Sequence, residues 1–188
     1  MEIDLSKLES ALEVLGQLLA DRGLQYEVVA IGGGSLLILG LIERSTKDLD
    51  LIALVKDQEL ITANPLPPPL VQAAEEVGTA LALGKNWLNN GPASLLEMGL
   101  PQGFLQRLHI RVYKGLIIYL ADRHDQICFK LYASVDQGPT SKHFADLRAL
   151  SPTWEELHQA KNWCITQDVS MDFEKDINQV IEIVHGSN

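Results

Sequence analysis

Apolar residues recur along this chain with two different periods, and each period predicts one kind of element. Leucines from Leu5 to Leu19 recur three to four residues apart, which predicts an amphipathic helix over 6–22 with Ser6 as its N-cap and Gly23 as its end. Short runs rich in aliphatic residues predict strands instead. These runs are 26–31, 48–55, 109–113 and 116–121.

The other apolar segments predict helices, and most of them follow the last strand. Two predicted helices lie between the strands, at 35–41 and 70–83, and four come after them, at 126–135, 141–150, 153–166 and 171–185. Thr153 and Glu156 have the spacing of a capping box. Lys114-Gly115 separates the last two strands and predicts a hairpin turn. The prolines within 64–69 predict a rigid connector, or else a loop at the mouth of a site.

This order of elements predicts an α/β (α+β) fold, in which a mixed sheet is flanked by helices and followed by a helical C-terminal part. We therefore expect a core over 1–125 and a helical part over 126–188 that packs on the core. A chain of 188 residues is long enough to bury such a core.

Composition places the chain among ordinary globular proteins, since 46% of its residues are hydrophobic and 21% are charged. No apolar run approaches the roughly 20 residues that a membrane span needs. The first residues are acidic rather than basic, and Cys128 and Cys164 lack metal-ligand spacing. We therefore expect a cytoplasmic protein without a membrane partner.

The net charge of −10 argues against a protein that binds nucleic acid through many phosphate contacts. Either the basic residues cluster locally, or the substrate is a small molecule, a protein or only an RNA end. A basic partner protein would also fit this charge. Composition does not separate these alternatives.

Asp48 and Asp50 are the most informative polar residues, because they interrupt an apolar run that predicts a strand. Residues two apart in a strand point to the same face, so the two carboxylates would stand side by side and repel each other. A divalent cation between them would reverse that penalty, and hard oxygen ligands suit Mg²⁺. The alternative is an exposed strand face with two solvated acids.

Gly33, Gly34 and Ser35 come between the first predicted strand and the next predicted helix. Glycines allow a tight turn and a close approach of backbone N–H groups to a phosphate where a helix starts, and Ser35 would cap that helix. The run lacks the spacing of a dinucleotide fingerprint, and no lysine follows it as in a Walker loop. A tight turn that also contacts phosphate is therefore the preferred interpretation.

These residues together resemble the signature of the DNA-polymerase-beta-like nucleotidyltransferase superfamily: a Gly-Gly or Gly-Ser turn, a short helix and an Asp-x-Asp pair on the next strand. Within it the chain looks most like small bacterial nucleotidyltransferase proteins related to abortive-infection toxins of the AbiEii type. Those proteins carry a later helix with a lysine, here Lys130, and a basic loop leading into Asp-Leu, here Lys142-His143 before Asp146. The resemblance covers roughly residues 25–150.

The resemblance implies an enzyme that transfers a nucleoside monophosphate from a nucleoside triphosphate (NTP, for example ATP) to an acceptor hydroxyl on tRNA or a protein. It also implies Mg²⁺ as cofactor and a toxin-like role balanced by a separate antitoxin. The metal ligands would be Asp48 and Asp50. The nucleotide-binding residues would be Gly33, Gly34, Ser35, Arg44, Lys130 and Lys142.

The superfamily usually has a third carboxylate on a later strand. The candidates are Asp122, which could lie at the end of the last strand and join the catalytic set, and Asp125, whose position suits the start of a helix. Because neither lies within an apolar strand as Asp50 does, a second hypothesis stays open. In it, the chain keeps the fold but acts as a catalytically inactive nucleotide-sensing or protein-interaction module.

Overall fold

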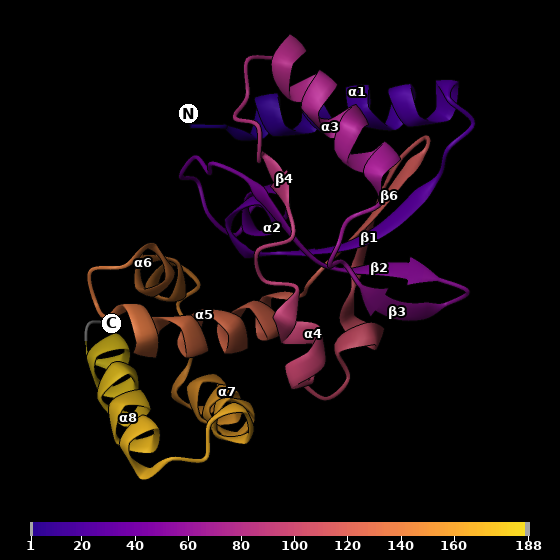
Figure 1. Ribbon diagram of the computed structural model, residues 1–188. Coiled ribbons are helices and arrows are strands. Elements are labelled where there is room, and N and C mark those ends of the chain that lie inside the picture. The colour runs from indigo at the N-terminus through magenta and orange to yellow at the C-terminus, as the bar shows by residue number, and fades with distance from the viewer. Residues whose placement is uncertain (1, 187–188) are drawn as a thin grey trace. The chain divides into compact units, whose positions relative to one another are not determined.

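The computed structural model describes residues 2–186 and divides the chain into two compact units (Figure 1). The first unit comprises Met1–Leu100 and Leu105–Ala121, and the second comprises Pro101–Phe104 and Asp122–Asn188. The main division therefore falls between 121 and 122, whereas the sequence pattern suggested a boundary between 125 and 126. No helix in the described part of the chain is both long and apolar enough to cross a membrane.

The first unit is built on a mixed sheet with the strand order β3-β2-β1-β6-β5, with β4 paired to β2. Strands β1 and β6 are parallel, whereas β1–β2, β2–β3 and β5–β6 are antiparallel. The strands are β1 (Tyr26–Ile31), β2 (Leu49–Lys56), β3 (Glu59–Thr62), β4 (Leu88–Asn89), β5 (His109–Tyr113) and β6 (Leu116–Leu120). This arrangement confirms the expected mixed sheet and the hairpin between its last two strands.

Helices pack against this sheet in the same unit. Helix α1 contacts β5, β6 and α3, and α2 contacts β1 and β2 (Figure 1). The helices are α1 (Leu5–Asp21), α2 (Gly32–Ile38), α3 (Pro68–Ala80) and α4 (Ser94–Met98), and a 3₁₀ turn, η1 (Phe104–Arg107), lies at a boundary of the two units in sequence. Strands β3 and β4, α4 and η1 were not expected from the sequence, because each is too short to show a period.

Helix α1 shows how the pattern of apolar residues becomes packing. The leucines Leu8, Leu12 and Leu15 are fully buried on its inner face, as their spacing predicts. The N-cap is Asp4, whose carboxylate accepts a hydrogen bond from Lys7 N at 2.8 Å, so the prediction that Ser6 caps the helix is wrong. Asp4 and Ser6 are both residue types that commonly cap helices, and the helix begins directly after Asp4.

The second unit is helical, as expected for the C-terminal part. Its helices are α5 (Arg123–Gln137), α6 (Lys142–Ala149), α7 (Trp154–Gln167) and α8 (Met171–His185). The capping box at the start of α7 is present, since Thr153 and Glu156 each accept a hydrogen bond from the other's backbone N–H. Burial and aromatic contacts hold the unit together, including the edge-to-face pair of Phe129 and Trp163, with ring centroids 5.4 Å apart.

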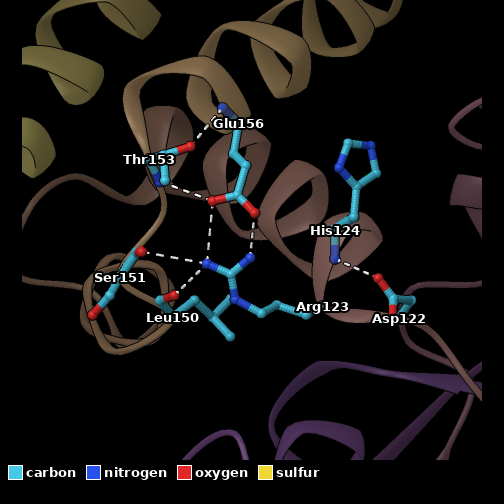
Figure 2. Close-up of polar contacts among 7 residues, drawn as sticks. All are labelled: Asp122, Arg123, His124, Leu150, Ser151, Thr153 and Glu156. Carbon is cyan, nitrogen blue, oxygen red and sulfur yellow. Dashed lines mark hydrogen bonds and ion pairs between the residues drawn. The ribbon is translucent and has the colours of Figure 1, made fainter.

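Arg123 ties three of the chain segments in this unit together (Figure 2). Its guanidinium forms an ion pair with Glu156 in the first turn of α7. The same group donates hydrogen bonds to the carbonyl oxygens of Leu150 at 2.7 Å and Ser151 at 3.3 Å. One side chain at the start of α5 therefore satisfies carbonyl oxygens that follow α6 and holds the Glu156 carboxylate in the first turn of α7.

Candidate active site

Asp48 and Asp50 lie at the beginning of β2, beside the first turn of α2. Asp48 directly precedes the strand and Asp50 is its second residue. Ile31, the last residue of β1, is the register partner of Asp50. The chain passes from Ile31 straight into α2, so the start of this helix and the start of β2 meet at one place in the first unit.

A side chain from β4 fixes one oxygen of Asp50. Asn89 is opposite Asp50 in the parallel pairing of β2 and β4, and its Nδ2 donates to Asp50 Oδ1 at 3.0 Å. The Oδ1 atom of Asn89 in turn accepts from Gly91 N at 2.8 Å, which orients the amide. Asn89 was missed by the sequence analysis, because only the short strand β4 brings it beside the carboxylate. Its position in a polar loop, two residues after the buried Trp87, was the one available signal.

Asp48 is half-buried and faces a pocket in the first unit. The backbone oxygen of Asp48 accepts a hydrogen bond from Thr46 Oγ1 at 3.1 Å, and Thr46 itself pairs with Ile3. Within residues 2–186, the Asp48 carboxylate receives no hydrogen bond and forms no ion pair. The backbone around Asp48 is therefore held, while its carboxylate has room for a ligand.

Close packing explains the glycine run. A Cβ atom on Gly34 would lie 2.7 Å from the carbonyl oxygen of Asp48, and one on Gly32 would lie 2.7 Å from Asp50 Oδ2. Gly32 also has a φ of +77°, which side chains disfavour. The absence of Cβ atoms thus lets the first turn of α2 lie directly against the segment that carries both aspartates.

The structure corrects one detail of the expected turn. Helix α2 begins at Gly32, with Ile31 as an N-cap that makes no side-chain hydrogen bond. Gly33 and Gly34 are inside the first turn rather than before it, and Ser35 is a fully buried helical residue. The prediction that Ser35 caps the helix is therefore wrong. The helix begins three residues earlier than predicted, because the glycines that were expected to form a turn are part of its first turn.

Arg44 places its guanidinium beside the first turn of α2. A Cβ atom on Gly33 would lie 3.1 Å from Arg44 Nη2 and 3.1 Å from Thr46 Oγ1, so the guanidinium lies over the backbone of this turn. Arg44 Nη1 also donates to Ser45 O at 2.9 Å. A guanidinium and the N–H groups at a helix start both favour a negatively charged group.

The other predicted site residues belong to the second unit. Asp122 is the N-cap of α5 and accepts a hydrogen bond from His124 N at 2.8 Å (Figure 2). Asp125 is fully buried in the first turn of α5. Lys142 is exposed at the start of α6. Their proposed catalytic and nucleotide-binding roles stay predictions.

Lys130 pairs with Asp146 inside the second unit. Its Nζ lies 2.6 Å from Asp146 Oδ2, and both side chains are almost completely buried. Lys130 therefore does not extend its ammonium group to solvent. Breaking such a buried pair leaves a charge without compensation, so this pair joins α5 and α6 firmly.

The donor set of the first unit suits a hard cation. Asp48 and Asp50 supply carboxylate oxygens, which Mg²⁺ prefers over nitrogen or sulfur ligands, and Mg²⁺ commonly takes only one or two carboxylates beside water and substrate phosphates. No group of three or more histidine, cysteine, aspartate or glutamate side chains that could hold a metal is present within residues 2–186. The residues thus fit a magnesium ion that shares its coordination with a phosphate ligand.

Comparisons with known proteins identify the family and the fold. Residues 6–140 match the model of a family described as nucleotidyltransferase of unknown function (DUF6036), and the chain belongs to this family. A crystal structure of an antigenic nucleotidyltransferase-like protein from Paracoccidioides brasiliensis matches with a TM-score of 0.51 and 15% sequence identity, over 97% of this chain and 95% of that one. This similarity shows a nucleotidyltransferase-like fold. A search of curated proteins found no significant match.

Proposed function

We propose that this member of the nucleotidyltransferase family transfers a nucleoside monophosphate from an NTP to an acceptor hydroxyl, and that the reaction depends on Mg²⁺. The observation that carries the proposal is the placement of Asp48 and Asp50 directly against the first turn of α2. The family match supports the reaction class. The proposed acceptor is a tRNA or a protein.

Each residue of the proposed site has a defined task. Asp48 and Asp50 would hold Mg²⁺, which when bound offsets charge on the triphosphate. Asn89 keeps the Asp50 carboxylate in one orientation. The backbone N–H groups of Gly33 and Gly34 and the guanidinium of Arg44 would contact phosphate oxygens. Ser35 is fully buried and Lys130 is paired with Asp146 inside the second unit, so neither is given a phosphate contact here. The roles of Asp122 and Lys142, which also belong to the second unit, stay predictions from the sequence.

Two finer parts of the proposal rest on the sequence resemblance. Similarity to proteins related to abortive-infection toxins supports a toxin-like role, with a separate antitoxin as partner. A second function, an inactive nucleotide-sensing or protein-interaction module, is favoured by one observation: Asp122, the candidate third carboxylate, accepts a hydrogen bond from His124 N as the N-cap of α5. One experiment decides between the transferase and the inactive module.

The experiment measures label transfer from each NTP. The protein is incubated with a radiolabelled NTP, Mg²⁺ and either total RNA or cell lysate, in parallel with the Asp48→Asn/Asp50→Asn variant. We expect transfer by the wild type and a loss of at least about a hundredfold in the variant, because the missing metal ligands remove electrostatic stabilisation of the transition state. A matched control is Asp136→Asn/Asp176→Asn, which neutralises two exposed aspartates on α5 and α8.

The outcomes separate the hypotheses. Transfer that survives in the Asp48→Asn/Asp50→Asn variant would remove these residues from the site. If the wild type transfers no label but binds NTP in a Mg²⁺-dependent way, the nucleotide-sensing module is supported. Absence of both transfer and NTP binding would contradict the nucleotide site altogether and leave a protein-interaction role.

A further inference from the structure

We infer that the pocket beside Asp48 binds the nucleoside part of the NTP, an assignment that rests on the proposed function. The pocket has a volume of about 660 Å³ and is formed within the first unit by the loop after β3, the helix α3 and the loop that contains β4. Small-molecule sites in proteins occupy roughly 300–1,000 Å³. The volume therefore suits a nucleoside whose phosphates extend to Asp48.

The pocket walls have the chemistry that a nucleobase needs. One part of the lining is apolar, which suits the faces of a planar ring, and includes Pro65, Leu66, Val71 and Leu88. The other part consists of hydrogen-bonding groups: the amides of Asn64 and Asn86, the Lys85 ammonium and the Glu75 carboxylate. Donors and acceptors around an apolar floor fix the orientation of a heterocycle that carries both kinds of group on its edge.

Three contacts hold these walls in place before a ligand arrives. Trp87 is fully buried and donates from Nε1 to the carbonyl oxygen of Ala74 at 2.8 Å, which fixes the β4 loop on α3. Asn90 Nδ2 donates to Ala63 O at 2.9 Å and lies 3.4 Å from Asn64 Oδ1, which joins the two loops. A site held in its binding shape loses less entropy when it binds a ligand.

Two groups in the pocket remain available for such a ligand. Lys85 and Asn86 are exposed, and within residues 2–186 their side chains make no hydrogen bond or ion pair. By contrast, Asn89 and Asn90 are engaged with Asp50 and with the opposite loop. Removing Lys85 and Asn86 should therefore change binding without disturbing the fold.

The charge of the pocket argues for a small molecule over a nucleic acid chain. Among the described residues that line it, Lys85 is the single cation, and Asp48 and Glu75 are both acidic. A groove that follows an RNA backbone needs several lysines or arginines to neutralise phosphates. A polymer acceptor is therefore disfavoured here, whereas an uncharged base and sugar are compatible with this lining.

The test compares NTPs with a ligand that has the three phosphates but lacks the nucleoside. Isothermal titration calorimetry measures the affinity for each of the four NTPs and for inorganic tripolyphosphate, all with Mg²⁺. We expect Lys85→Ala/Asn86→Ala to weaken NTP binding by about tenfold, the equivalent of one or two lost hydrogen bonds, and to leave tripolyphosphate binding unchanged. The matched control, Lys175→Ala/Asn162→Ala, changes the same residue types on exposed positions of α8 and α7.

Each other result overturns the assignment in a recognisable way. Equal weakening of both ligands would make Lys85 a phosphate contact, and unchanged affinity for both would exclude the pocket, provided that Asp48→Asn/Asp50→Asn still abolishes binding. Unchanged NTP affinity with slower label transfer would make the pocket an acceptor site. If neither ligand binds the wild type, the proposed function itself fails.

Discussion

Gly34 shows at the scale of one residue how tightly the proposed site is built. Replacing it with alanine adds a methyl group 2.7 Å from the backbone oxygen of Asp48 and 2.9 Å from Leu49 Cδ1. The carbonyl cannot swing aside as a flexible side chain can. We expect Gly34→Ala to lower the free energy of unfolding by about 1–3 kcal/mol, which exceeds the gain of up to about 1 kcal/mol in helix propensity.

Urea denaturation at neutral pH measures this change as a shift of the midpoint. Gly84→Ala is the matched control, because a Cβ atom there meets nothing within 4 Å and its φ is not positive. It should leave stability unchanged to within about 0.5 kcal/mol. A Gly34→Ala protein as stable as the wild type would show that α2 can shift away from β2.

The same residues show which parts of the site are visible in a sequence. Asp48 and Asp50 are recognisable because their spacing in an apolar run is itself the signal. Asn89 is not recognisable, since its role depends on pairing between β2 and a strand of two residues. Whether Ser35 caps a helix also depends on where the chain enters α2, and this is decided by packing against β2 rather than by local preference.

At the scale of elements, Arg123 and Glu156 predict a specific dependence of stability on pH. The hydrogen bond from Arg123 lowers the pKa of the Glu156 carboxyl below its ordinary value of 4.5, against a smaller opposing effect of burial. Between the lowered pKa and 4.5 the unfolded chain binds more protons than the folded one, so stability rises with pH. The contribution of Glu156 is therefore complete above 4.5 and is lost as the pH falls through the lowered value.

The variant Glu156→Gln keeps an oxygen that can accept from Thr153 N but removes the charge. We expect it to lower the free energy of unfolding at pH 7 by about 1 kcal/mol, because both partners are partly exposed and water screens the pair. Urea melts at pH 7, 5 and 3 should show this difference shrinking on acidification. Glu155→Gln, an exposed residue in the same helical turn, is the control. A difference that grows at low pH would contradict the assignment.

The elements themselves differ in how well the sequence predicts them. The capping box of α7 and the leucine stripe of α1 follow from local chemistry, and both were predicted. Strand β3 has four residues, of which three are exposed, so no alternation of buried and exposed positions distinguishes it from a loop. Its structure comes from pairing with β2, which is information that the local sequence does not contain.

At the scale of the whole molecule, the net charge limits how strongly the protein can bind RNA. The chain carries 25 acidic and 15 basic residues and has a net charge of −10. Proteins that bind nucleic acid without sequence preference depend on many phosphate contacts, each of which releases counterions and makes binding weaker in salt. An acidic nucleotidyltransferase can still use an RNA acceptor if it contacts only the end that receives the nucleotide.

The acidic net charge predicts that the affinity for RNA depends only weakly on salt. For single strands the logarithm of affinity falls by about 0.7 per phosphate contact for each tenfold rise in salt, so one or two contacts cost less than about tenfold between 50 and 200 mM KCl. Fluorescence anisotropy with a labelled single-stranded RNA, titrated at several KCl concentrations, measures the slope. The Lys142→Ala variant tests whether the exposed lysine at the start of α6 supplies one of these contacts, with Lys175→Ala on α8 as its control. A loss of a thousandfold over the same range would instead require about seven or more phosphate contacts, and with them a concentrated basic surface despite the acidic total.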